Sequence, residues 1–319
     1  MYYDCPVILE DFLNYIETIK GKSPNTVKEY YFDLRTFFRF LKIRYRLVDR
    51  NTDFEEIDIQ DVDISLIRKV TLQDLYAFIS YVDKQRDNKN YAKARKVASI
   101  RSFFKYLHTK VKLIDENPAQ DLESPKTDRR HPVYLTLDEA KRLLDVIDGP
   151  FKERDYAIIT LFLNCGLRLS ELVSIDIDKI KGDILTVVGK GNKERTIYLN
   201  EACVEAINKY LEVRPKENLK DKKALFISKR KNRISHKAVQ HLVKKYLKLA
   251  GLDTKKYSTH KLRHTAATLM YKYGNVDIRA LQQILGHENV STTQIYTHID
   301  DERLRQAVKS NPLSQTKKE

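Results

Sequence analysis

The sequence predicts a mainly α-helical protein built from two domains. Apolar residues recur at helical spacing along much of the 319-residue chain, and 42% of all residues are hydrophobic, which is enough material for compact cores. Glycine is scarce, at 9 residues, and tryptophan is absent. This composition excludes disorder of the whole chain and disfavours glycine-rich all-β folds and glycine-rich nucleotide-binding loops.

A proline-rich segment predicts the boundary between the domains. Pro118, Pro125 and Pro132 follow closely on one another in the stretch NPAQDLESPKTDRRHPVYLT, which also holds a basic cluster. This composition is typical of an interdomain linker. The sequence therefore predicts a helical domain over residues 1–123, a linker over 124–132 and a second, mostly helical domain over 133–319.

Helix signals define the first domain. Ser23 followed by Pro24 is a typical helix start, and apolar residues continue from it at helical spacing. Further helices are expected over about residues 72–83 and 90–108. Residues 53–63 hold six acids, and we expect this insert to point away from any polyanion.

The helix expected over residues 90–108 carries cations and no acid. Its basic residues are Lys93, Arg95, Lys96, Arg101 and Lys105. A solvated helix face usually mixes both signs, whereas a face of one sign suits a phosphate-lined groove. The sequence therefore predicts that these five residues contact DNA, with a merely solvated face as the alternative.

The second domain begins at a capping box formed by Thr136 and Glu139. Helices are expected over about residues 137–147, 153–165, 168–174, 201–213, 236–250, 260–273, 277–285, 291–298 and 301–310. The glycines that follow predicted helix ends are Gly166, Gly251, Gly274 and Gly286. A left-handed residue is favoured at such positions. Two β-rich runs, 184–188 and 195–199, predict a small antiparallel hairpin.

The charge balance indicates a polyanionic partner. Lys and Arg number 59 against 44 Asp and Glu, a formal net charge of +15. Each cation that neutralises a phosphate releases counterions and gains affinity by that release, so nucleic acid is a better partner than a membrane surface. The alternative is that the charge only keeps the protein soluble.

The chain lacks the marks of membrane or secreted proteins. It has no run of 18 apolar residues, and acids stand where a signal peptide needs a basic flank and an apolar stretch. Cys5, Cys165 and Cys203 are too few and too widely spaced for a disulfide framework or a paired-cysteine zinc site. We expect a soluble, cytoplasmic protein with reduced, mostly packed thiols.

Two pairs of polar residues in the second domain suit an anion. Glu171 lies one helical turn after Arg168 and can orient its guanidinium for bidentate phosphate binding, although such pairs are more often surface ion pairs. His260 and Arg263 share one face of a predicted helix start and can also donate to an anion. A zinc site that uses His260 and His264 is disfavoured because Arg263 would repel the metal ion.

Two loop regions add further candidates. The hairpin turn contains Lys190 and is no P-loop, because it joins two strands instead of opening a helix. It is either an ordinary exposed turn or one whose lysine reaches a phosphate. The segment LGHENVSTTQIYTH holds His287 and Tyr296, and only its neighbours distinguish this tyrosine from the other 18.

Four strings, taken in order and spacing, resemble the catalytic domain of tyrosine recombinases, most closely of the Xer type: CGLRLSEL, VVGKGNKERTIYL, STHKLRHTAATLM and LQQILGHENVSTTQIYTH. SPNTVKEYYFDLRTFFRFL and NPAQDLESPK resemble the family's SAM-like core-binding domain and linker. The resemblance implies a two-domain DNA clamp, with Glu171 supporting the active site. It implies that the catalytic residues are Arg168, Lys190, His260, Arg263, His287 and Tyr296.

The resemblance also implies the chemistry. Tyr296 would form a 3′-phosphotyrosyl bond while Arg168 and Arg263 hold the non-bridging oxygens, so that no metal or other cofactor is required. Lys190 is the candidate general acid for the leaving 5′-oxygen, and His260 is a base or proton relay.

The implied partners are a double-stranded DNA recombination site and other copies of the chain. Residues 300–310 would form a helix that docks on a neighbouring subunit in a tetramer on two duplexes, or else packs on its own domain. A second recombinase or a DNA translocase can share or regulate the reaction. The implied role is Xer-like resolution of chromosome or plasmid dimers. The alternatives are a mobile-element integrase or excisionase, a type IB topoisomerase and a non-catalytic DNA-binding protein.

Overall fold

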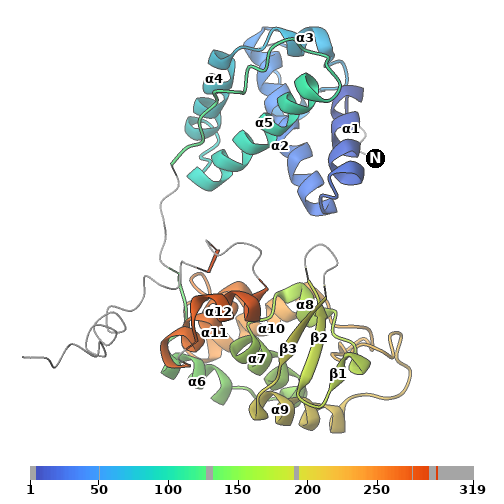
Figure 1. The fold of residues 1–319 in the computed structure, drawn as a ribbon, viewed down its shortest axis with the longest axis vertical. Coiled ribbons are helices and arrows are strands. Elements are labelled where there is room, and N and C mark those ends of the chain that lie inside the picture. The colour runs from blue at the N-terminus through green and yellow to red at the C-terminus, as the bar shows by residue number, and fades with distance from the viewer. Residues whose placement is uncertain are drawn as a thin grey trace, which may run out of the picture. The chain divides into compact units, whose positions relative to one another are not determined.

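The computed structural model of the chain describes residues 5–49, 51–126, 132–189, 194–274, 276–286 and 292–293. The chain forms two compact units, residues 1–129 and 130–319 (Figure 1). The division between them falls inside the segment that the sequence predicts to be a linker. The domain limits 1–123 and 133–319 stay predictions.

The first unit has helices and no strand among its described residues. Its elements are α1 (Val7–Asn14), the π-helix η1 (Tyr15–Ile19), α2 (Pro24–Arg44), the 3₁₀-helix η2 (Phe54–Glu56), α3 (Ile64–Arg68), α4 (Leu72–Lys84) and α5 (Asn90–Thr109). Ser23 caps α2, as predicted, by accepting a hydrogen bond from the backbone N–H of Thr26. The helices predicted over 72–83 and 90–108 are confirmed to within one residue.

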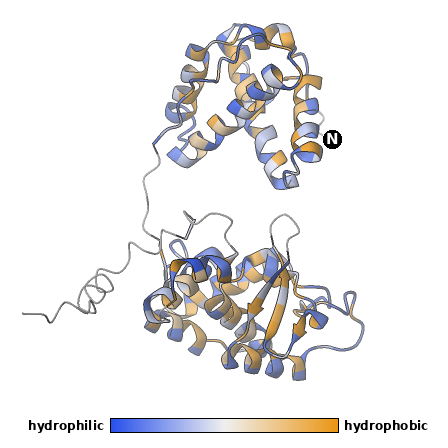
Figure 2. Ribbon diagram, in the orientation of Figure 1, coloured by the Kyte–Doolittle hydropathy of each residue, from blue (hydrophilic) through white to orange (hydrophobic). Residues whose placement is uncertain are grey.

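Aromatic side chains fill the core of the first unit. Phe37 of α2, Phe78 of α4 and Phe104 of α5 are fully buried. The ring of Phe37 meets that of Phe78 edge-on, with centroids 5.1 Å apart, and that of Phe104 at 6.2 Å. Edge-to-face contacts of this kind add stability beyond the burial of area. Figure 2 shows how apolar and polar residues alternate along these helices.

The acidic insert is anchored to the same unit. Ile59 and Val62 are buried in its core. Glu55 pairs with Arg39 at 2.6 Å, and Asp61 pairs with Lys42 at 2.7 Å. Part of the insert's negative charge is therefore neutralised by cations of α2. Its orientation relative to a polyanion stays a prediction.

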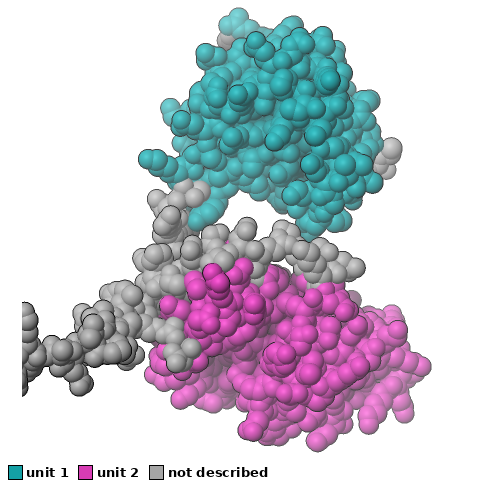
Figure 3. Space-filling view, viewed as in Figure 1, with its two compact units in different colours: residues 1–129 teal, residues 130–319 magenta. Residues whose placement is uncertain are grey.

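The second unit, magenta in Figure 3, combines helices with a small sheet. Its elements are α6 (Leu137–Asp145), α7 (Lys152–Cys165), α8 (Leu169–Val173), the 3₁₀-helix η3 (Ile177–Lys179), β1 (Ile180–Lys181), β2 (Ile184–Val188), β3 (Glu194–Tyr198), α9 (Glu201–Val213), α10 (His236–Leu249), α11 (Thr259–Tyr273) and α12 (Ile278–Leu285). The predicted hairpin is confirmed as β2 and β3, which pair antiparallel with Leu185 opposite Ile197. The two-residue strand β1 adds an edge strand that the sequence did not predict.

Helix α7 forms the centre of the second unit. It packs against α9 and α11, and its residues Ile158, Ile159 and Phe162 are fully buried. A helix that is apolar on most of its circumference is a core helix. Leu185 and Ile197 of the sheet belong to the same hydrophobic core. This packing fixes the carboxyl end of α7, from which the chain continues into α8.

Glycines end three helices as predicted. Gly166, Gly251 and Gly286 have φ angles of +59°, +71° and +63°, in the left-handed region. Gly274 also follows a helix end, that of α11, as predicted, but the left-handed conformation expected there is wrong, because its φ is −90°. A Cβ there would meet the carbonyl oxygen of Met270 at 2.7 Å, so close approach to the backbone explains this glycine. The helices predicted over 291–298 and 301–310 lie outside the described residues, apart from 292–293.

Candidate active site

A buried carboxylate, Glu171, organises the second unit beyond the end of α7. Its side chain is 0% exposed. Arg168 is the N-cap residue of α8, and its backbone N–H donates to Oε2 of Glu171 at 2.7 Å. Glu171 therefore caps its own helix, while the buried Leu172 anchors α8 in the core.

Three arginines surround this carboxylate. Arg168 Nη1 donates to Oε1 of Glu171 at 2.7 Å. Arg195, on β3, makes a bidentate contact, with Nη2 at 2.9 Å from Oε2 and Nε at 3.2 Å from Oε1. Nη1 of Arg263, on α11, lies 3.9 Å from Oε2. The structure thus confirms the predicted pair of Arg168 and Glu171 and brings Arg263 to the same carboxylate.

Each guanidinium group also donates to carbonyl oxygens where α7 and α12 end. Arg263 makes two such bonds, both of 2.6 Å, Arg168 makes one of 2.8 Å, and Arg195 makes one. The acceptors are Gly166 and Leu285 for Arg263, Gly286 for Arg168, and Ile284 for Arg195. Carbonyls in the last turn of a helix lack partners inside the helix, so the arginines satisfy them and fix both helix ends.

The four side chains of this cluster carry an excess of positive charge. Burial alone would raise the pKa of Glu171, but the hydrogen bond and charge of Arg195 and the hydrogen bonds of Arg168 outweigh it and lower that pKa. One negative charge therefore faces three positive charges. The side chain of Arg168 is 31% exposed, against 4% for Arg263. Such a partly open, positive cluster favours binding of an anion.

His260 lies near this cluster, at the second position of α11, and is exposed. Its ring meets that of His264 edge-on, with centroids 4.5 Å apart. Partial desolvation and the positive charges of Lys261, Arg263 and Arg168 lower the pKa of His260. Its imidazole is therefore mostly neutral at pH 7 and has one nitrogen that accepts a proton.

Three of the predicted catalytic residues, Lys190, His287 and Tyr296, lie outside the described residues. Their chain neighbours are described. Gly189, the residue after β2, directly precedes Lys190, and Gly286, whose carbonyl accepts from Arg168, directly precedes His287.

Sequence reasoning missed Arg195. The structure places it in the middle of the Glu171 cluster, with its side chain 13% exposed. The signal in the sequence was the two-residue repeat of a β-strand. Residues two apart share a strand face, and Arg195 is two residues from the buried Ile197. A charged residue on the inward face of a strand requires a buried partner.

One of the five cations predicted to contact DNA lies in a protein core. Lys96 is 7% exposed, and its ammonium group donates to Asp33 of α2 at 2.7 Å. Arg95 donates to the same carboxylate at 2.8 Å and lies 2.6 Å from Glu29. The expectation that all five residues share an outer face is therefore wrong for Lys96, because α2 supplies acids that the sequence of α5 does not reveal.

The remaining cations of α5 differ in their surroundings. Lys93 forms an ion pair with Asp83 of α4. Arg101 and Lys105 are exposed. DNA contact by these residues stays a prediction.

The structure also shows where the cysteines lie and bears on metal sites and membrane-spanning helices. Cys165 and Cys203 are buried free thiols with Sγ atoms 3.7 Å apart, and Cys5 is half-buried, which confirms mostly packed thiols. Within the described part of the chain, no group of three or more His, Cys, Asp or Glu residues could hold a metal ion. None of the described helices has the length and apolar character to cross a membrane.

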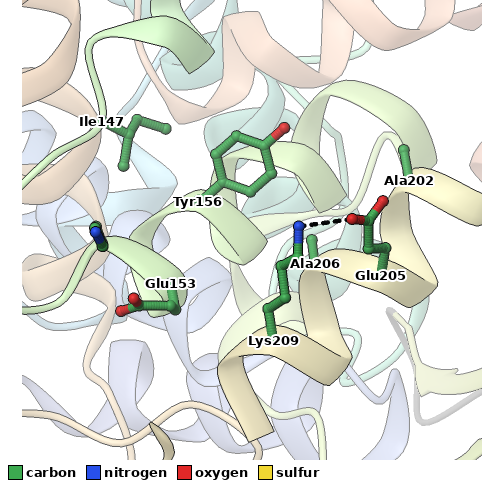
Figure 4. A pocket seen from close by; sticks show the side chains of 8 residues that line it. Ile147, Glu153, Tyr156, Ala202, Glu205, Ala206 and Lys209 are labelled. Carbon is green, nitrogen blue, oxygen red and sulfur yellow. Dashed lines mark ion pairs between the residues drawn. The ribbon is translucent and has the colours of Figure 1, made fainter. Parts of the chain in front are cut away.

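A surface cavity lies apart from the Glu171 cluster, between α7 and α9 (Figure 4). Its lining includes Tyr156 and the ion pair of Lys209 with Glu205, whose atoms lie 2.6 Å apart. That pair joins positions i and i+4 of one exposed helix face, a contact of small energetic value. None of the predicted site residues lines this cavity.

The fold is that of solved site-specific DNA recombinases. The chain matches the pre-cleavage complex of the XerH recombinase bound to its difH substrate with a TM-score of 0.68 and 20% identity, over 94% of this chain and 84% of that one. It matches a lambda integrase tetramer bound to a Holliday junction with a TM-score of 0.63 and 19% identity, over 89% and 77%. These likenesses confirm the mainly helical fold expected from the sequence.

Residues 133–303 match the phage integrase family. The chain is 68% identical to a tyrosine recombinase XerC of Caldanaerobacter subterraneus subsp. tengcongensis, over 97% of this chain and 88% of that protein. It is 36% identical to a tyrosine recombinase XerC of Thermodesulfovibrio yellowstonii, over 96% of each. The chain therefore belongs to the phage integrase family. It is a DNA-binding enzyme, a site-specific recombinase of the tyrosine type, as the sequence resemblance implied.

Proposed function

We propose that this recombinase resolves chromosome or plasmid dimers and that the Glu171 cluster binds the scissile phosphate. The observation that carries the proposal is the charge excess of the cluster, in which one carboxylate faces three arginines. A phosphodiester supplies the missing negative charge in a shape that guanidinium groups bind bidentately. Strong identity to a relative named as a Xer-type recombinase supports dimer resolution over integration of a mobile element.

The proposed reaction begins with attack of the Tyr296 oxygen on phosphorus. This bond forms as the bond from phosphorus to the 5′-oxygen breaks, which leaves a 3′-phosphotyrosyl link and a free 5′-hydroxyl. Arg168 and Arg263 stabilise the charge that develops on the non-bridging oxygens. Lys190 protonates the leaving 5′-oxygen, and His260 removes the phenolic proton. The lowered pKa of His260 supports this role, because only the neutral ring can accept a proton.

The remaining parts of the site complete this scheme. His287 donates a hydrogen bond to the same phosphate, and Glu171 holds the arginines in place. The phosphotyrosyl link retains the energy of the broken bond, so a 5′-hydroxyl from another strand reverses the step without ATP, metal or cofactor. Strand exchange is the result.

We infer a matching assembly. The domains over 1–123 and 133–319, joined by the linker over 124–132, grip a duplex recombination site, with Lys93, Arg95, Arg101 and Lys105 of α5 as candidate phosphate contacts. Residues 300–310 link protomers into a tetramer on two duplexes, an assembly state known for the lambda integrase of the same fold. A second recombinase or a DNA translocase can regulate it. The reaction takes place in the cytoplasm, and its DNA affinity falls steeply as salt rises.

A nicked suicide substrate tests the chemistry. A nick close to the cleavage site lets a short strand diffuse away, so that religation fails and the covalent protein–DNA adduct accumulates. We expect the parent protein to form this adduct on its recombination site and Tyr296→Phe to form none. DNA binding without any adduct in the parent protein would instead identify a non-catalytic DNA-binding protein.

The same DNA separates the enzymatic alternatives. Relaxation of a supercoiled plasmid that lacks a recombination site would indicate a type IB topoisomerase. Conversion of a plasmid dimer with two sites into monomers supports the proposed role. Efficient joining of two unlike sites, without resolution of identical ones, would favour a mobile-element integrase.

A further inference from the structure

We propose that Arg195 is a positioning residue for DNA cleavage, because its guanidinium binds Glu171 bidentately and also binds the end of α12. In this role Arg195 sets the orientation of Glu171, and Glu171 in turn sets the orientation of Arg168 and Arg263. The inference rests on the proposed function and adds to it a residue that acts through Glu171.

The hydrogen bonds around Glu171 show how Arg195 can orient the carboxylate. The carboxylate oxygens accept four hydrogen bonds, of which Arg195 supplies two and Arg168 supplies two, one of them from its backbone. Arg195 is thus the only bidentate side-chain partner among the described residues in contact with Glu171. Its two parallel bonds help to fix the plane of the carboxylate, together with the two bonds of Arg168, one of which comes from the backbone.

Packing confirms that Arg195 is built into the site. Its side chain is 13% exposed, and a Cβ at Gly286 would come within 2.8 Å of its Cδ. Gly286 also provides the carbonyl that accepts from Arg168, at 2.8 Å. The same turn of chain therefore leaves room for one arginine and binds another, which couples the positions of Arg195 and Arg168.

The contacts of Arg195 also join elements that are distant in sequence. Arg195 is paired with Val187 in the hairpin register, so its anchor is a strand held in the core sheet. Its Nη1 donates to the carbonyl of Ile284, next to Leu285, whose carbonyl accepts from Arg263 at 2.6 Å. Loss of Arg195 would release the end of α12 and leave a buried carboxylate with fewer donors. Both changes move Arg168 and Arg263 without removing either.

Arg233 offers a matched control. Like Arg195, it joins carboxylate and backbone acceptors: it pairs with Asp176 and Asp221, and it donates to the backbone carbonyls of Val173 and Ile175 at 3.1 and 3.2 Å. It belongs to the same unit, and its hydrogen bonds and ion pairs join Asp176, Asp221, Val173 and Ile175 instead of Glu171. The effect of replacing Arg233, which disrupts a structural arginine network, can therefore be compared with the effect of replacing Arg195 at Glu171.

The experiment measures single-turnover adduct formation on the nicked substrate by full-length Arg195→Gln, Arg195→Lys and Arg233→Gln. DNA affinity and the thermal midpoint are measured for each protein. We expect Arg195→Gln to cleave at least about 30-fold more slowly, with DNA affinity within about threefold of the parent, because correct orientation of the clamp is lost while the cationic surface remains. Arg195→Lys should recover part of the rate, and Arg233→Gln should cleave within about threefold of the parent even where its midpoint falls equally.

A second substrate sharpens the assignment. A 5′-bridging phosphorothiolate has a leaving group that needs no proton, so it bypasses the general acid. The slow cleavage by Arg195→Gln should persist on it, because the defect lies at the non-bridging oxygens.

Restoration of Arg195→Gln to the parent rate on this substrate would overturn the proposal, as would a loss of cleavage rate in Arg233→Gln equal to that in Arg195→Gln. Cleavage by Arg195→Gln at the parent rate would remove only the role of Arg195, whereas absence of adduct in the parent protein would defeat the proposed function itself.

Discussion

Among its described residues, each unit of the molecule holds one fully buried carboxylate surrounded by cations, and the two centres differ in charge balance. Asp33 and Glu171 are both 0% exposed. Around Asp33, the cations Arg95 and Lys96 are balanced by a second acid, Glu29, which lies 2.6 Å from Arg95. Around Glu171, three arginines face the single carboxylate. The first centre is neutral as it stands, whereas the second is complete only with an added anion.

The pKa values of Asp33 and Glu171 shift in opposite directions because the two centres differ in charge balance. Burial raises the pKa of Asp33, and the bond and charge of Lys96 and the charge of Arg95 do not fully offset it. At Glu171 the arginine bonds and a backbone N–H more than offset burial, and the pKa is lowered. Planar guanidinium forks supply more directed donors than a single ammonium group does. We infer that the Asp33 centre is structural and that the Glu171 centre is a binding site.

The largest expected effect comes from removing a cation at the unbalanced centre. Arg168→Ala and Arg263→Ala should each slow adduct formation by at least about 1000-fold, because a donor to the developing charge is lost in a partly buried site. Duplex binding should persist, since many other cations remain. Suicide-substrate cleavage and gel-shift titrations on the same preparations measure both. Normal cleavage by either variant would contradict the proposed clamp.

Removing the carboxylate at the balanced centre should affect folding instead of chemistry. Asp33→Leu leaves Lys96 buried without its main partner, and we expect a loss of about 3 kcal/mol in the free energy of unfolding. The folded fraction should still form adduct at the parent rate, because Asp33 and the Glu171 cluster belong to different units. Urea unfolding and single-turnover cleavage below the transition check this. A large rate loss in fully folded protein would show that the Asp33 centre serves the reaction.

Replacing the whole pair should restore most of that stability. The double variant Asp33→Leu with Lys96→Met removes both buried charges, and exchanges of this kind are often neutral or stabilising. We expect its free energy of unfolding to lie within about 1 kcal/mol of the parent. A double variant as unstable as Asp33→Leu alone would mean that the ion pair itself, and not the unpaired charge, determines the loss.

Local signals in the sequence predicted much of the fold. Ser23 with Pro24, and Thr136 with Glu139, are helix-start patterns that act over three residues, and both are confirmed. The spacing of Arg168 and Glu171 likewise predicted their contact within one helical turn. Such features need no knowledge of the rest of the chain.

The features that sequence reasoning missed depend on distant partners. Arg195 meets Glu171 across 24 residues, and Lys96 meets Asp33 across 63. No local pattern reveals which acid a buried cation meets, because packing of separate helices and strands decides it. The family resemblance only implied that Arg263 and Glu171 belong to one active site, and the structure adds that Arg263 lies 3.9 Å from Glu171 and is held by carbonyls at two helix ends.

The smallest expected effect is a difference in the acid response of the two centres. Glu171 has a lowered pKa, so its contribution to stability is present above the ordinary carboxyl value of 4.5 and is lost as the pH falls through the folded-state pKa. Asp33 has a raised pKa, so the folded state binds its proton more tightly and gains stability as the pH falls toward the ordinary value of 3.8. Urea unfolding between pH 7 and pH 4 compares the parent with Asp33→Asn and Glu171→Gln. As the pH falls, the free energy of unfolding of the parent should rise relative to that of Asp33→Asn. Over the same range, the free energy of unfolding of the parent should fall relative to that of Glu171→Gln. Shifts of the same sign would contradict the contrast between a structural centre and a binding centre.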